Sequence, residues 1–522
     1  MDTTDNSADV LRCFVSGIGG TCKSFLIKTL KVWVKTHLNK KVAVSAPTGI
    51  AAFNVNGLTI HRLLQLPVEH KQTPKYKPLS DEVLQVLRSD LKEVVLFIID
   101  EVSMISNVTL TYYIHLRLSE IFDTSDDQNG WFGKKHLVVF GDLLQLPPVR
   151  EKSPFEKLTN TETNKLLGSL SMPNLWIELF TYDELTINMR QINDSDFVDM
   201  LNRIRLGVTT KKDRELLSTR LLTLKSDSNE NRLTEIIKHL SKLPDDTVCL
   251  LPTKNMCQQL NTAMLRSLPH PEINLIAIDS IDCPRYLTKR ARECIKKYED
   301  DASMTAGLEK NIIIKIGAKV MLRRNIDVSL GLVNGSISIV RKVKVDPENS
   351  KIIKRIYITF NNEPNAYELG PVKTKFEIIN RAYVHREQFP ICIAYAITIH
   401  KSQGLSLSNA LMDIGSAVFT SGQAYVALSR VTSLGGLHLI NVDFGSIKAQ
   451  ESSICEYNRL RSIYRPDLSK IETSKPPRKA HRDREWALRK TVAEAQEVVP
   501  EKKKRKTTYK NKKYHKTFNK IR

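Results

Sequence analysis

The sequence predicts an α/β protein in which a parallel sheet with helices on both faces forms the first part of the chain. From residue 10 to residue 150, short runs of β-branched residues alternate with helical stretches, and this alternation is typical of parallel sheets. From about residue 310 to residue 390 the pattern changes to alternation in twos, which is typical of antiparallel strands. From residue 474 the chain is basic and poor in apolar side chains, so a disordered tail is expected there.

Four apolar runs are expected to be strands of the first sheet, and each of them ends in polar residues. The runs read VLRCFVSG, KVAVSAP, VVLFIIDE and HLVVFGD. Ligands of open parallel sheets bind at the carboxyl ends of the strands, so the polar residues that end these runs predict a site along one edge. These residues are 17–24, 47–49, 100–101 and 141–142.

A second α/β domain is expected to begin near Asp194. The stretch DSDFVDMLNRIRLG has helical spacing and ends at a glycine, while TVCLLPTKNMCQQLNTAML reads as a strand, a turn and a helix. The runs NIIIKIGAKVMLRRN, SISIVRKVKVD and KIIKRIYITF alternate in twos and are separated by NG and NN turn signals, which predicts a small antiparallel barrel. Because FPICIAYAITIHKSQG then returns to a buried strand, the barrel is expected to be an insertion in the second domain.

The composition indicates a soluble protein of several domains from a reducing compartment. A chain of 522 residues is too long for one core, so about two to four domains are expected. The hydrophobic content is 41%, the mean hydropathy is −0.27, and no apolar run approaches the length of a membrane-spanning helix. The first residues, MDTTDNSADV, are acidic and polar and show no secretory signal. The eight cysteines include no CxxC pair, which argues against a zinc site or a disulfide framework.

The charge of the chain indicates a polyanionic partner. The formal net charge is +22, and the segment from Ser474 onward holds 18 lysines and arginines against 5 acidic residues. Such a charge favours nucleic acid as the partner, while the plainer interpretation is a solvated tail on a mildly basic enzyme. Within the tail, EKKKRK reads either as a nuclear localisation or polyanion-binding patch or as ordinary solvated sequence.

The stretch GIGGTCKS, residues 17–24, resembles a phosphate-binding loop with one deviation. The pattern is G-x-x-x-x-G-K-[ST], and a cysteine stands where the second glycine belongs. Glycines leave the loop free to aim backbone N–H groups at phosphates, the lysine supplies a cation, and the serine hydroxyl is a ligand for Mg²⁺. Taken alone, the loop has a second interpretation as a tight turn before a helix. The candidate ATP-binding residues are Gly17, Gly19, Gly20, Thr21, Cys22, Lys23 and Ser24.

Two acids follow the apolar run VLFII and complete a nucleotide site. Asp100 is expected to hold Mg²⁺ through its water shell, and Glu101 is expected to orient or deprotonate the attacking water. The alternative is an exposed acidic pair that caps the next helix. A phosphate loop and an acidic strand end in this order together favour binding of a nucleoside triphosphate.

Three further polar residues lie in contexts suited to sensing the γ-phosphate. Gln145 follows another strand in VVFGDLLQLPPV, Arg190 lies in LTINMRQ, and Arg430 lies in GQAYVALSRV. An arginine beside a transferring phosphate stabilises the charge of the transition state, although a single arginine is more often a surface ion-pair residue. Their contexts, rather than their identities, make these three residues catalytic candidates.

Seven stretches, in order, resemble those of the PIF-type DNA helicases, which belong to the RecD-like branch of helicase superfamily 1. They are APTGIAAFNVNGLTIHRLLQLP, IIDEVSMI, FGDLLQLPPV, LTINMRQ, GLVNGS, AITIHKSQGLSL and GQAYVALSRVTSLGGLHL, and the resemblance extends over about residues 10–445. The details GLVNGS and RLSEIF look most like the helicase part of rolling-circle (Helitron) transposon proteins.

The resemblance implies two RecA-like P-loop motor domains with ATP bound between them. The insertion at the second domain corresponds to the small β-barrel of the family. The expected ranges are 1–190 for the first domain with a wedge region at about 65–93, 191–310 and 390–450 for the second domain, 311–389 for the barrel and 474–522 for the basic disordered tail.

The resemblance also implies roles for individual residues. The phosphate-loop lysine and serine and the two acids keep the roles inferred above, Gln145 couples the γ-phosphate to DNA, and Arg190 and Arg430 are arginine fingers from across the cleft. Phe53 and Tyr395 are flat side chains near the implied path of the DNA strand, but core positions are the stronger expectation for both. The residues implied to line that path are Thr48, His61, Thr398, His400 and Lys401.

The activity implied by the resemblance is ATP-driven, 5′-to-3′ translocation on single-stranded DNA with unwinding of forked duplex, and the implied cofactors are ATP and Mg²⁺. Links to DNA recombination, repair and telomere maintenance are implied in the same way. A nuclear location without a membrane partner is expected, and the oligomeric state is left open. The alternatives are a catalytically impaired DNA-binding remnant of a transposon helicase and a motor that acts on RNA.

The chain departs from the family pattern in three respects. Cys22 replaces the glycine before Lys23, where a side chain is expected to crowd the phosphate or tilt the loop, so that hydrolysis is slower than in a Cys22→Gly variant. Only MDTTDNSADVLR precedes the first strand, without the glutamine that reads adenine, so weak base selectivity and a trimmed start are expected. No paired-histidine nickase signature with a downstream tyrosine is visible. Together these features point to a degenerate copy of a mobile-element helicase.

Overall fold

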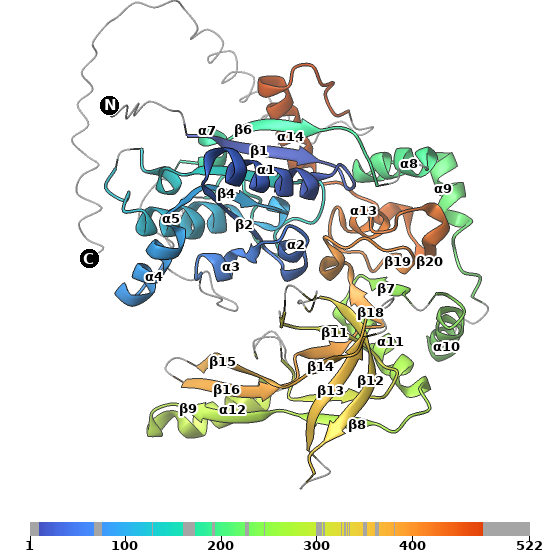
Figure 1. The fold of residues 1–522 in the computed structure, drawn as a ribbon. Coiled ribbons are helices and arrows are strands. Elements are labelled where there is room, and N and C mark those ends of the chain that lie inside the picture. Colours follow the sequence, from blue (N-terminus) through green and yellow to red (C-terminus); the bar gives the residue numbers. More distant parts are fainter. Residues whose placement is uncertain are drawn as a thin grey trace, which may run out of the picture.

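The computed structural model contains two parallel sheets and three antiparallel sheets (Figure 1). The parallel sheets form two neighbouring α/β bodies in the upper half of the view, and the antiparallel sheets lie below the second of them. The structure describes residues 10–66, 76–127, 129–159, 173–190, 194–224, 229–244, 246–298, 305, 308–324, 326–327, 330, 332, 335–347, 352–360, 365–379 and 382–472.

The first domain is built on a six-stranded sheet in which every strand pair is parallel. The strand order is β3–β2–β4–β5–β1–β6, which confirms the parallel sheet predicted from residues 10–150. The strands are β1 (Arg12–Gly17), β2 (Lys41–Ala46), β3 (Leu58–Thr59), β4 (Val94–Ile99), β5 (His136–Gly141) and β6 (Thr181–Leu185).

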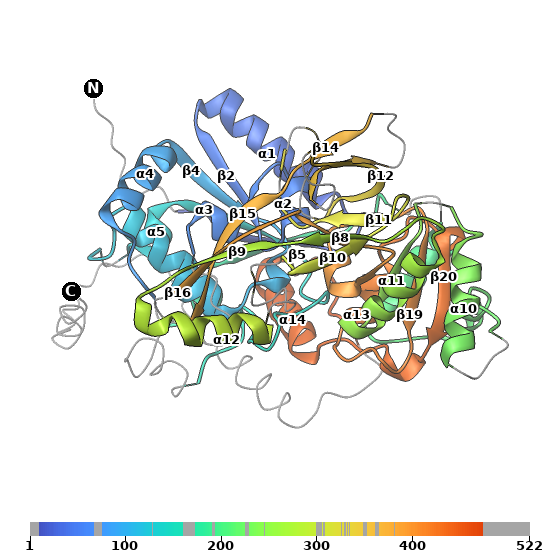
Figure 2. The same ribbon diagram turned by 90° about the horizontal axis from the view of Figure 1, so that it is seen from below.

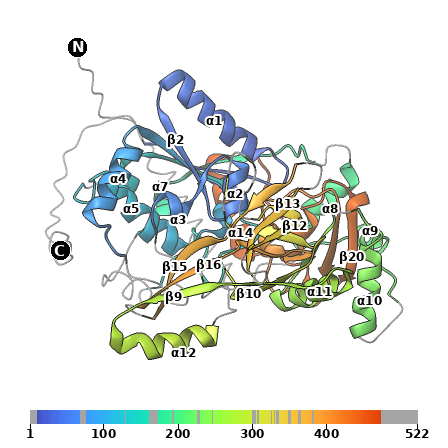
Figure 3. The ribbon, with the colours of Figure 1, turned by 60° about the horizontal axis from the view of Figure 1, so that its bottom comes forward.

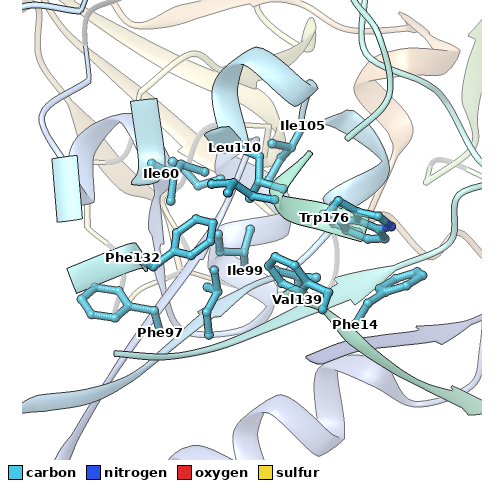
Figure 4. Packing of buried hydrophobic residues seen from close by; sticks show 14 of the residues in the cluster. Phe14, Ile60, Phe97, Ile99, Ile105, Leu110, Phe132, Val139 and Trp176 are labelled. Carbon is cyan, nitrogen blue, oxygen red and sulfur yellow. The ribbon is translucent and has the colours of Figure 1, made fainter. Parts of the chain in front are cut away.

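Both faces of this sheet are buried. Along β4, Phe97 and Ile99 join a large core that also contains Trp176 (Figure 4), whereas Ile98 packs on the other face with Ile27 of α1. Because alternate residues of a strand point to opposite faces, a strand covered on both sides reads as one continuous apolar run. The helices are α1 (Lys23–Leu38), α2 (Gly49–Asn54), α3 (Ile60–Leu63), α4 (Asp81–Leu91), α5 (His115–Ile121) and α7 (Leu175–Leu179).

The second domain contains a four-stranded parallel sheet in the order β18–β7–β19–β20. This agrees with the second α/β domain expected from residue 194 onward. The elements are α8 (Ser195–Arg205), α9 (Lys211–Ser218), α10 (Asn229–Leu240), β7 (Val248–Leu251), α11 (Lys254–Ser267), β18 (Ala396–Thr398), β19 (Ala410–Ile414), α13 (Gln423–Leu428) and β20 (Leu437–Val442).

The chain between α11 and β18 forms the antiparallel sheets, which Figure 2 shows from below. One sheet has the order β14–β13–β12–β11–β17, a two-stranded sheet joins β10 to β8, and a third has the order β15–β16–β9. The first two share one apolar core, but hydrogen bonding between the described strands leaves the five-stranded sheet open, so closure into a barrel is not confirmed. The elements are β8 (Ile273–Ile276), β9 (Ile278–Asp282), α12 (Thr288–Tyr298), β10 (Asn311–Ile314), β11 (Lys319–Leu322), β12 (Ile337–Val345), β13 (Ile353–Thr359), β14 (Tyr367–Leu369), β15 (Val372–Ile379), β16 (Ala382–Gln388) and β17 (Ile391–Ile393).

The antiparallel region begins earlier than the sequence pattern indicates. Strands β8 and β9 fall within 191–310, the range predicted for the second RecA-like domain, yet β8 pairs with β10 and β9 pairs with β16. Helix α12 packs along the β9 sheet (Figure 3), where Ala291 shares a small core with Val384. Two short strands do not reveal their partners from local alternation, so the boundary at residue 310 is wrong for these elements.

The last described helix, α14 (Glu451–Tyr464), returns to the first domain. Its Tyr457 joins the large core of the first sheet, and the indole nitrogen of Trp176 donates a 2.8 Å hydrogen bond to Glu456. No role was predicted for this segment, because its partners lie far away in the sequence. Residues 67–75 of the predicted wedge and the predicted tail at 474–522 lie outside the described residues. Among the described residues, no helix has the length and apolar character needed to cross a bilayer.

Candidate nucleotide site and nucleic-acid track

The predicted phosphate loop connects β1 to α1. Strand β1 ends at Gly17 and α1 begins at Lys23, so the helix N-terminus faces the loop, as phosphate binding requires. The Thr21 hydroxyl donates a 2.9 Å hydrogen bond to the carbonyl oxygen of Ile18 and fixes the turn. At Gly20, φ is +97°, and an added Cβ would lie 2.4 Å from the Asn188 side chain, so this position needs glycine.

Cys22 has a left-handed backbone, with φ 61° and ψ 27°, and it precedes the first residue of α1. This conformation explains why the pattern has glycine at the position, since a side chain in the left-handed region costs about 1–2 kcal/mol. The cysteine side chain is exposed, and the helix still begins at Lys23. The deviation from the glycine pattern appears as strain in the backbone of Cys22, and the expected crowding of the phosphate or tilt of the loop stays a prediction.

Lys23 folds back onto the loop. Its Nζ donates hydrogen bonds of 2.6 Å to the carbonyl oxygen of Gly17 and 3.1 Å to that of Ile18. Burial lowers the pKa of the Lys23 ammonium group, and the carboxylates of Glu101, Asp142 and Asp100 oppose that effect. An ammonium group beside these carboxylates is placed to receive phosphate oxygens in exchange for the two carbonyls.

The two predicted acids lie at the end of β4 and are buried, Asp100 to 5% exposure and Glu101 to 8%. The backbone N–H of Glu101 donates a 2.9 Å hydrogen bond to Asp100 Oδ1. Burial and the neighbouring Glu101 raise the pKa of Asp100. Two buried carboxyl groups side by side favour a cation between them and the phosphates. The alternative of an exposed acidic pair that caps the next helix is wrong.

A pocket of about 310 Å³ lies between the two parallel-sheet domains. It brings together the loop, both acids and all three predicted γ-phosphate residues, together with Asn54 and Gly404 from opposite domains. Gly17 does not line this pocket; its carbonyl oxygen instead accepts from Lys23. The predicted residues that line the pocket are Gly19, Gly20, Thr21, Cys22, Lys23, Ser24, Asp100, Glu101, Gln145, Arg190 and Arg430.

The two arginines meet at Ser429. Arg190 donates a 3.0 Å hydrogen bond to the carbonyl oxygen of Ser429, and Arg430 donates a 2.8 Å hydrogen bond to its hydroxyl. Burial lowers the pKa of both guanidinium groups, and the nearby charge of Arg190 helps to lower that of Arg430 to about 10. The carboxylate of Glu101 opposes the shift of both groups. Two neighbouring buried cations are more stable when an anion such as a triphosphate lies between them.

Two residues that were not predicted connect the domains across this pocket. Gln403 Nε2 donates hydrogen bonds of 3.0 Å to Glu101 and 3.2 Å to Gln145. Tyr425 accepts a 3.1 Å hydrogen bond from the backbone N–H of Gly19. Gln403 lies in the polar turn after a strand, in IHKSQG, so the rule that ligands bind at strand ends provides a signal for it. Tyr425 lies inside a helix and carries no such signal.

Asp142, at the fourth predicted strand end, has a structural role. It is fully buried, and it accepts hydrogen bonds of 2.9 and 2.7 Å from Arg205 of α8 and one of 3.1 Å from Tyr457 of α14. Burial alone would raise the pKa of Asp142, but the charge and hydrogen bonds of Arg205 hold it below its usual range. This network ties α8 and α14 to the end of β5.

The residues predicted to line the DNA path lie at the strand ends outside the pocket. Thr48 follows β2, and its hydroxyl accepts a 3.3 Å hydrogen bond from the N–H of Ala51 at the start of α2. A 2.8 Å hydrogen bond from Asn54 to the carbonyl oxygen of Gly404 brings the α2 segment against the turn that follows β18. The other four are His61, exposed on α3, Thr398 at the end of β18, and His400 and Lys401 in the next turn.

The two flat side chains near this path are placed differently. Tyr395 is 8% exposed, with Lys319 Nζ 5.7 Å from its ring centre, which agrees with the expected core position. The prediction for Phe53 concerns a side chain outside the described part of the structure.

Comparisons with known proteins agree with this geometry. Residues 3–215 match the PIF1-like helicase family, and residues 307–343 match the 2B domain of the DNA helicase Pif1. The chain is 30% identical over 467 residues to the ATP-dependent DNA helicase Pif1 of Bdellovibrio bacteriovorus, covering 88% of this chain and 91% of that protein. It is 28% identical over 449 residues to the ATP-dependent DNA helicase PIF1 of Xenopus laevis, covering 86% of this chain. The chain spans 62% of the length of the Xenopus protein and 61% of its Danio rerio relative.

Solved structures show the same fold. Pif1 helicase from Candida albicans is 24% identical, with a TM-score of 0.64 over 86% of this chain and 96% of that one. Pif1 helicase from Bacteroides, solved in complex with ADP-AlF3 and ssDNA, is 24% identical, with a TM-score of 0.62 over 88% of this chain and 95% of that one. Given the 30% identity to the Bdellovibrio protein over most of both chains, this chain belongs to the PIF1-like helicase family.

Proposed function

We propose that this protein is an ATP-dependent DNA helicase that moves 5′ to 3′ along single-stranded DNA and unwinds forked duplex. The observation that carries the proposal is the position of Gln403. From the second domain, its amide group contacts Glu101 and Gln145 of the first domain. Thr398, His400 and Lys401, which come just before Gln403 in the chain, belong to the predicted DNA path, so a short segment connects the hydrolytic acid to the DNA strand.

In this mechanism the loop and the helix N-terminus bind the triphosphate. Backbone N–H groups and the α1 dipole attract the phosphates, and Lys23 exchanges its bonds to Gly17 and Ile18 for phosphate oxygens. Tyr425 contacts the loop at Gly19, so the second domain is placed to detect occupancy of the site. Binding of ATP therefore draws the two domains together.

The residues present fit Mg²⁺. Ser24 and Asp100 both line the pocket, and burial and the neighbouring Glu101 raise the pKa of Asp100 by more than the charge of Lys23 lowers it. Among the described residues there is no cluster of three or more His, Cys, Asp or Glu side chains suited to a metal, so phosphate oxygens would complete the ligand set. The ion, when bound, neutralises phosphate charge.

Hydrolysis requires a base and cations near the γ-phosphate. Glu101 accepts the hydrogen bond from Gln403 and is placed to orient water, while Arg190 and Arg430 reach the same pocket. Arginines at a transferring phosphoryl group typically contribute about 10³–10⁵ in rate. A shift of Gln403 when DNA binds its turn would change the position of Glu101, which would link hydrolysis to movement.

The test is ATP hydrolysis with and without single-stranded DNA, for the native protein and for Lys23→Ala. DNA is expected to stimulate the native protein, and Lys23→Ala is expected to lose both basal and stimulated turnover because the loop then lacks its cation. Hydrolysis that persists in Lys23→Ala would show that activity in the preparation does not come from this site.

The strained backbone at Cys22 favours a second candidate, a DNA-binding protein with an impaired motor. It predicts DNA binding without ATP turnover. Competition between DNA and RNA oligonucleotides distinguishes these two DNA-directed candidates from a motor that acts on RNA.

Roles in recombination, repair and telomere maintenance, a nuclear location and a Helitron origin remain predictions. Nuclear accumulation with and without residues 475–522 tests the location.

A further inference from the structure

The carboxyl edge of the second sheet has side chains that the ATP site does not use. Strands β18, β7 and β19 are parallel neighbours, so the residues that follow them meet at one edge. His400 and Lys401 follow β18, Lys254 follows β7, and Phe419 follows β19. Together they combine an aromatic pair with two lysines, and we call them the edge cluster.

Phe419 is the exposed member of the aromatic pair. Its ring stacks on His400 with centroids 5.7 Å apart and an angle of 14° between the planes, and 67% of the residue is exposed. Burying a phenylalanine side chain is worth about 1.5–3 kcal/mol, so leaving this ring in water forgoes stability. One face is covered by the histidine and the rest is open to a flat partner.

A buried glutamine holds Phe419 in place. Gln423 is 0% exposed; its Oε1 accepts a 3.1 Å hydrogen bond from the backbone N–H of Phe419, and its Nε2 donates a 3.3 Å hydrogen bond to the carbonyl oxygen of Pro252. Pro252 lies two residues before Lys254. The glutamine therefore fixes the loop that carries the ring relative to the loop that carries the lysine, as a preorganised site requires.

The lysines of the edge cluster give it a positive charge. Neither Lys254 nor Lys401 makes an ion pair or side-chain hydrogen bond with any described residue. Burial lowers the pKa of Lys401, and the nearby charges of Arg323 and Lys254 lower it further. The two lysine ammonium groups suit the phosphate of a nucleotide, and the exposed ring of Phe419 suits its base.

We propose that the edge cluster is a nucleotide subsite, in which one base of single-stranded DNA stacks on Phe419 and the adjoining phosphates are held by Lys254 and Lys401. This proposal rests on the proposed function, because it assumes that single-stranded DNA crosses this edge. It adds two residues, Phe419 and Lys254, to the predicted path and assigns base stacking to one position on it.

The chain offers a matched control for the aromatic ring. Trp33 on α1 is also exposed, to 47%, and it also stacks on a histidine, His37, with centroids 5.2 Å apart. It lies one turn from His37 on the same helix, which also carries Lys31 and Lys35, and it is not part of the edge cluster. Trp33→Leu therefore removes an exposed aromatic ring that the subsite does not include.

The experiment measures affinity for a fluorescent oligo-dT and for the same oligonucleotide with abasic positions, at one salt concentration, using full-length protein. Phe419→Leu keeps the apolar volume but removes the flat ring, and it is expected to weaken oligo-dT binding about tenfold, as loss of one stacked base does. Its affinity for the abasic strand is expected to stay within about twofold of native. Phe419→Tyr restores oligo-dT binding, and Trp33→Leu matches the native protein.

The outcomes separate the subsite from the helicase function. If the native protein binds oligo-dT and Phe419→Leu binds it equally well, or loses the same affinity for both strands, the subsite is overturned while the helicase function stands. If the native protein binds neither strand, both are overturned. Lys254→Gln and Lys401→Gln are expected to weaken binding to both strands, since phosphate contacts are independent of the base. A separate series of salt concentrations is expected to show a smaller salt dependence for these two variants than for the native protein.

Discussion

At the scale of single residues, Cys22 and Asp100 show how the site departs from maximum stability. Cys22 occupies a left-handed conformation that suits glycine, and Asp100 is a carboxyl group buried beside another acid. Both features weaken the nucleotide-free fold locally. Such conflicts between local preference and structure are expected where a protein binds a ligand.

Cys22→Gly is expected to raise the free energy of unfolding by about 1 kcal/mol, because relief of the left-handed strain outweighs the added freedom of the unfolded chain. It is also expected to raise kcat/KM for ATP. Thermal unfolding and steady-state ATPase assays measure the two effects. Cys22→Ala is the control, since it removes the thiol but keeps the Cβ, and it is expected to gain nothing. Equal kcat/KM for native and Cys22→Gly proteins would contradict this interpretation of the loop.

Asp100→Asn is expected to stabilise the nucleotide-free protein at pH 8. The folded-state pKa of Asp100 is raised above its unfolded value, so its carboxylate destabilises the fold at pH values above its ordinary pKa. At pH 8 the amide removes that penalty, so the free energy of unfolding is expected to rise by about 1–3 kcal/mol. Near pH 4 the Asp100 carboxyl group is largely neutral in the folded protein, so the gain from the substitution is smaller. Denaturant unfolding at both pH values provides the measurement.

Asp142→Asn is expected to change the free energy of unfolding in the opposite direction, by lowering it at pH 8. Arg205 holds the folded-state pKa of Asp142 below its usual range, so the carboxylate stabilises the fold above its unfolded pKa, and this contribution is lost as pH falls through the folded pKa. At pH 8 the substitution leaves a buried arginine unpaired and is expected to cost about 3–5 kcal/mol. If Asp100→Asn and Asp142→Asn both raise the free energy of unfolding, then burial alone, and not the charged neighbours such as Arg205, sets the pKa of these two acids.

At the scale of elements, the turn after β18 connects hydrolysis to the DNA path. Gln403 in this turn contacts Glu101, 302 residues away in the sequence, while His400 and Lys401 lie three and two residues earlier. Because the turn is short, a displacement at one end is transmitted to the other. The coupling proposed above therefore belongs to this element.

Gln403→Ala is expected to lower the stimulation of ATP hydrolysis by single-stranded DNA about tenfold or more, because Glu101 then loses its contact with the turn. Binding of a fluorescent ATP analogue is expected to change little, since the phosphate loop is intact. A Gln403→Ala protein with native stimulation by DNA would exclude the turn as the coupling element.

At the scale of the whole molecule, local patterns predicted the parallel sheets, and most of the candidate nucleotide-site residues line one pocket. The run VVLFIIDE predicts a strand buried on both faces with acids at its end, because burial and alternation are local properties. The roles of Tyr425 and α14 could not be predicted, because each depends on a contact between distant segments. The position of Gln403 after a strand was a signal for a site residue, but its contact with Glu101 could not be predicted from the sequence. The same holds for β8 and β9, whose partners are set by strand pairing and not by their own composition.

The measurement that tests the central claim most directly is unwinding of forked DNA with one labelled strand. The native protein is expected to separate a duplex that has a 5′ single-stranded tail when ATP and Mg²⁺ are present. No separation is expected with ATP omitted, with a 3′ tail alone, or with Lys23→Ala. Binding of the 5′-tailed fork without ATP-dependent separation would contradict the account and would leave a DNA-binding protein with an impaired motor.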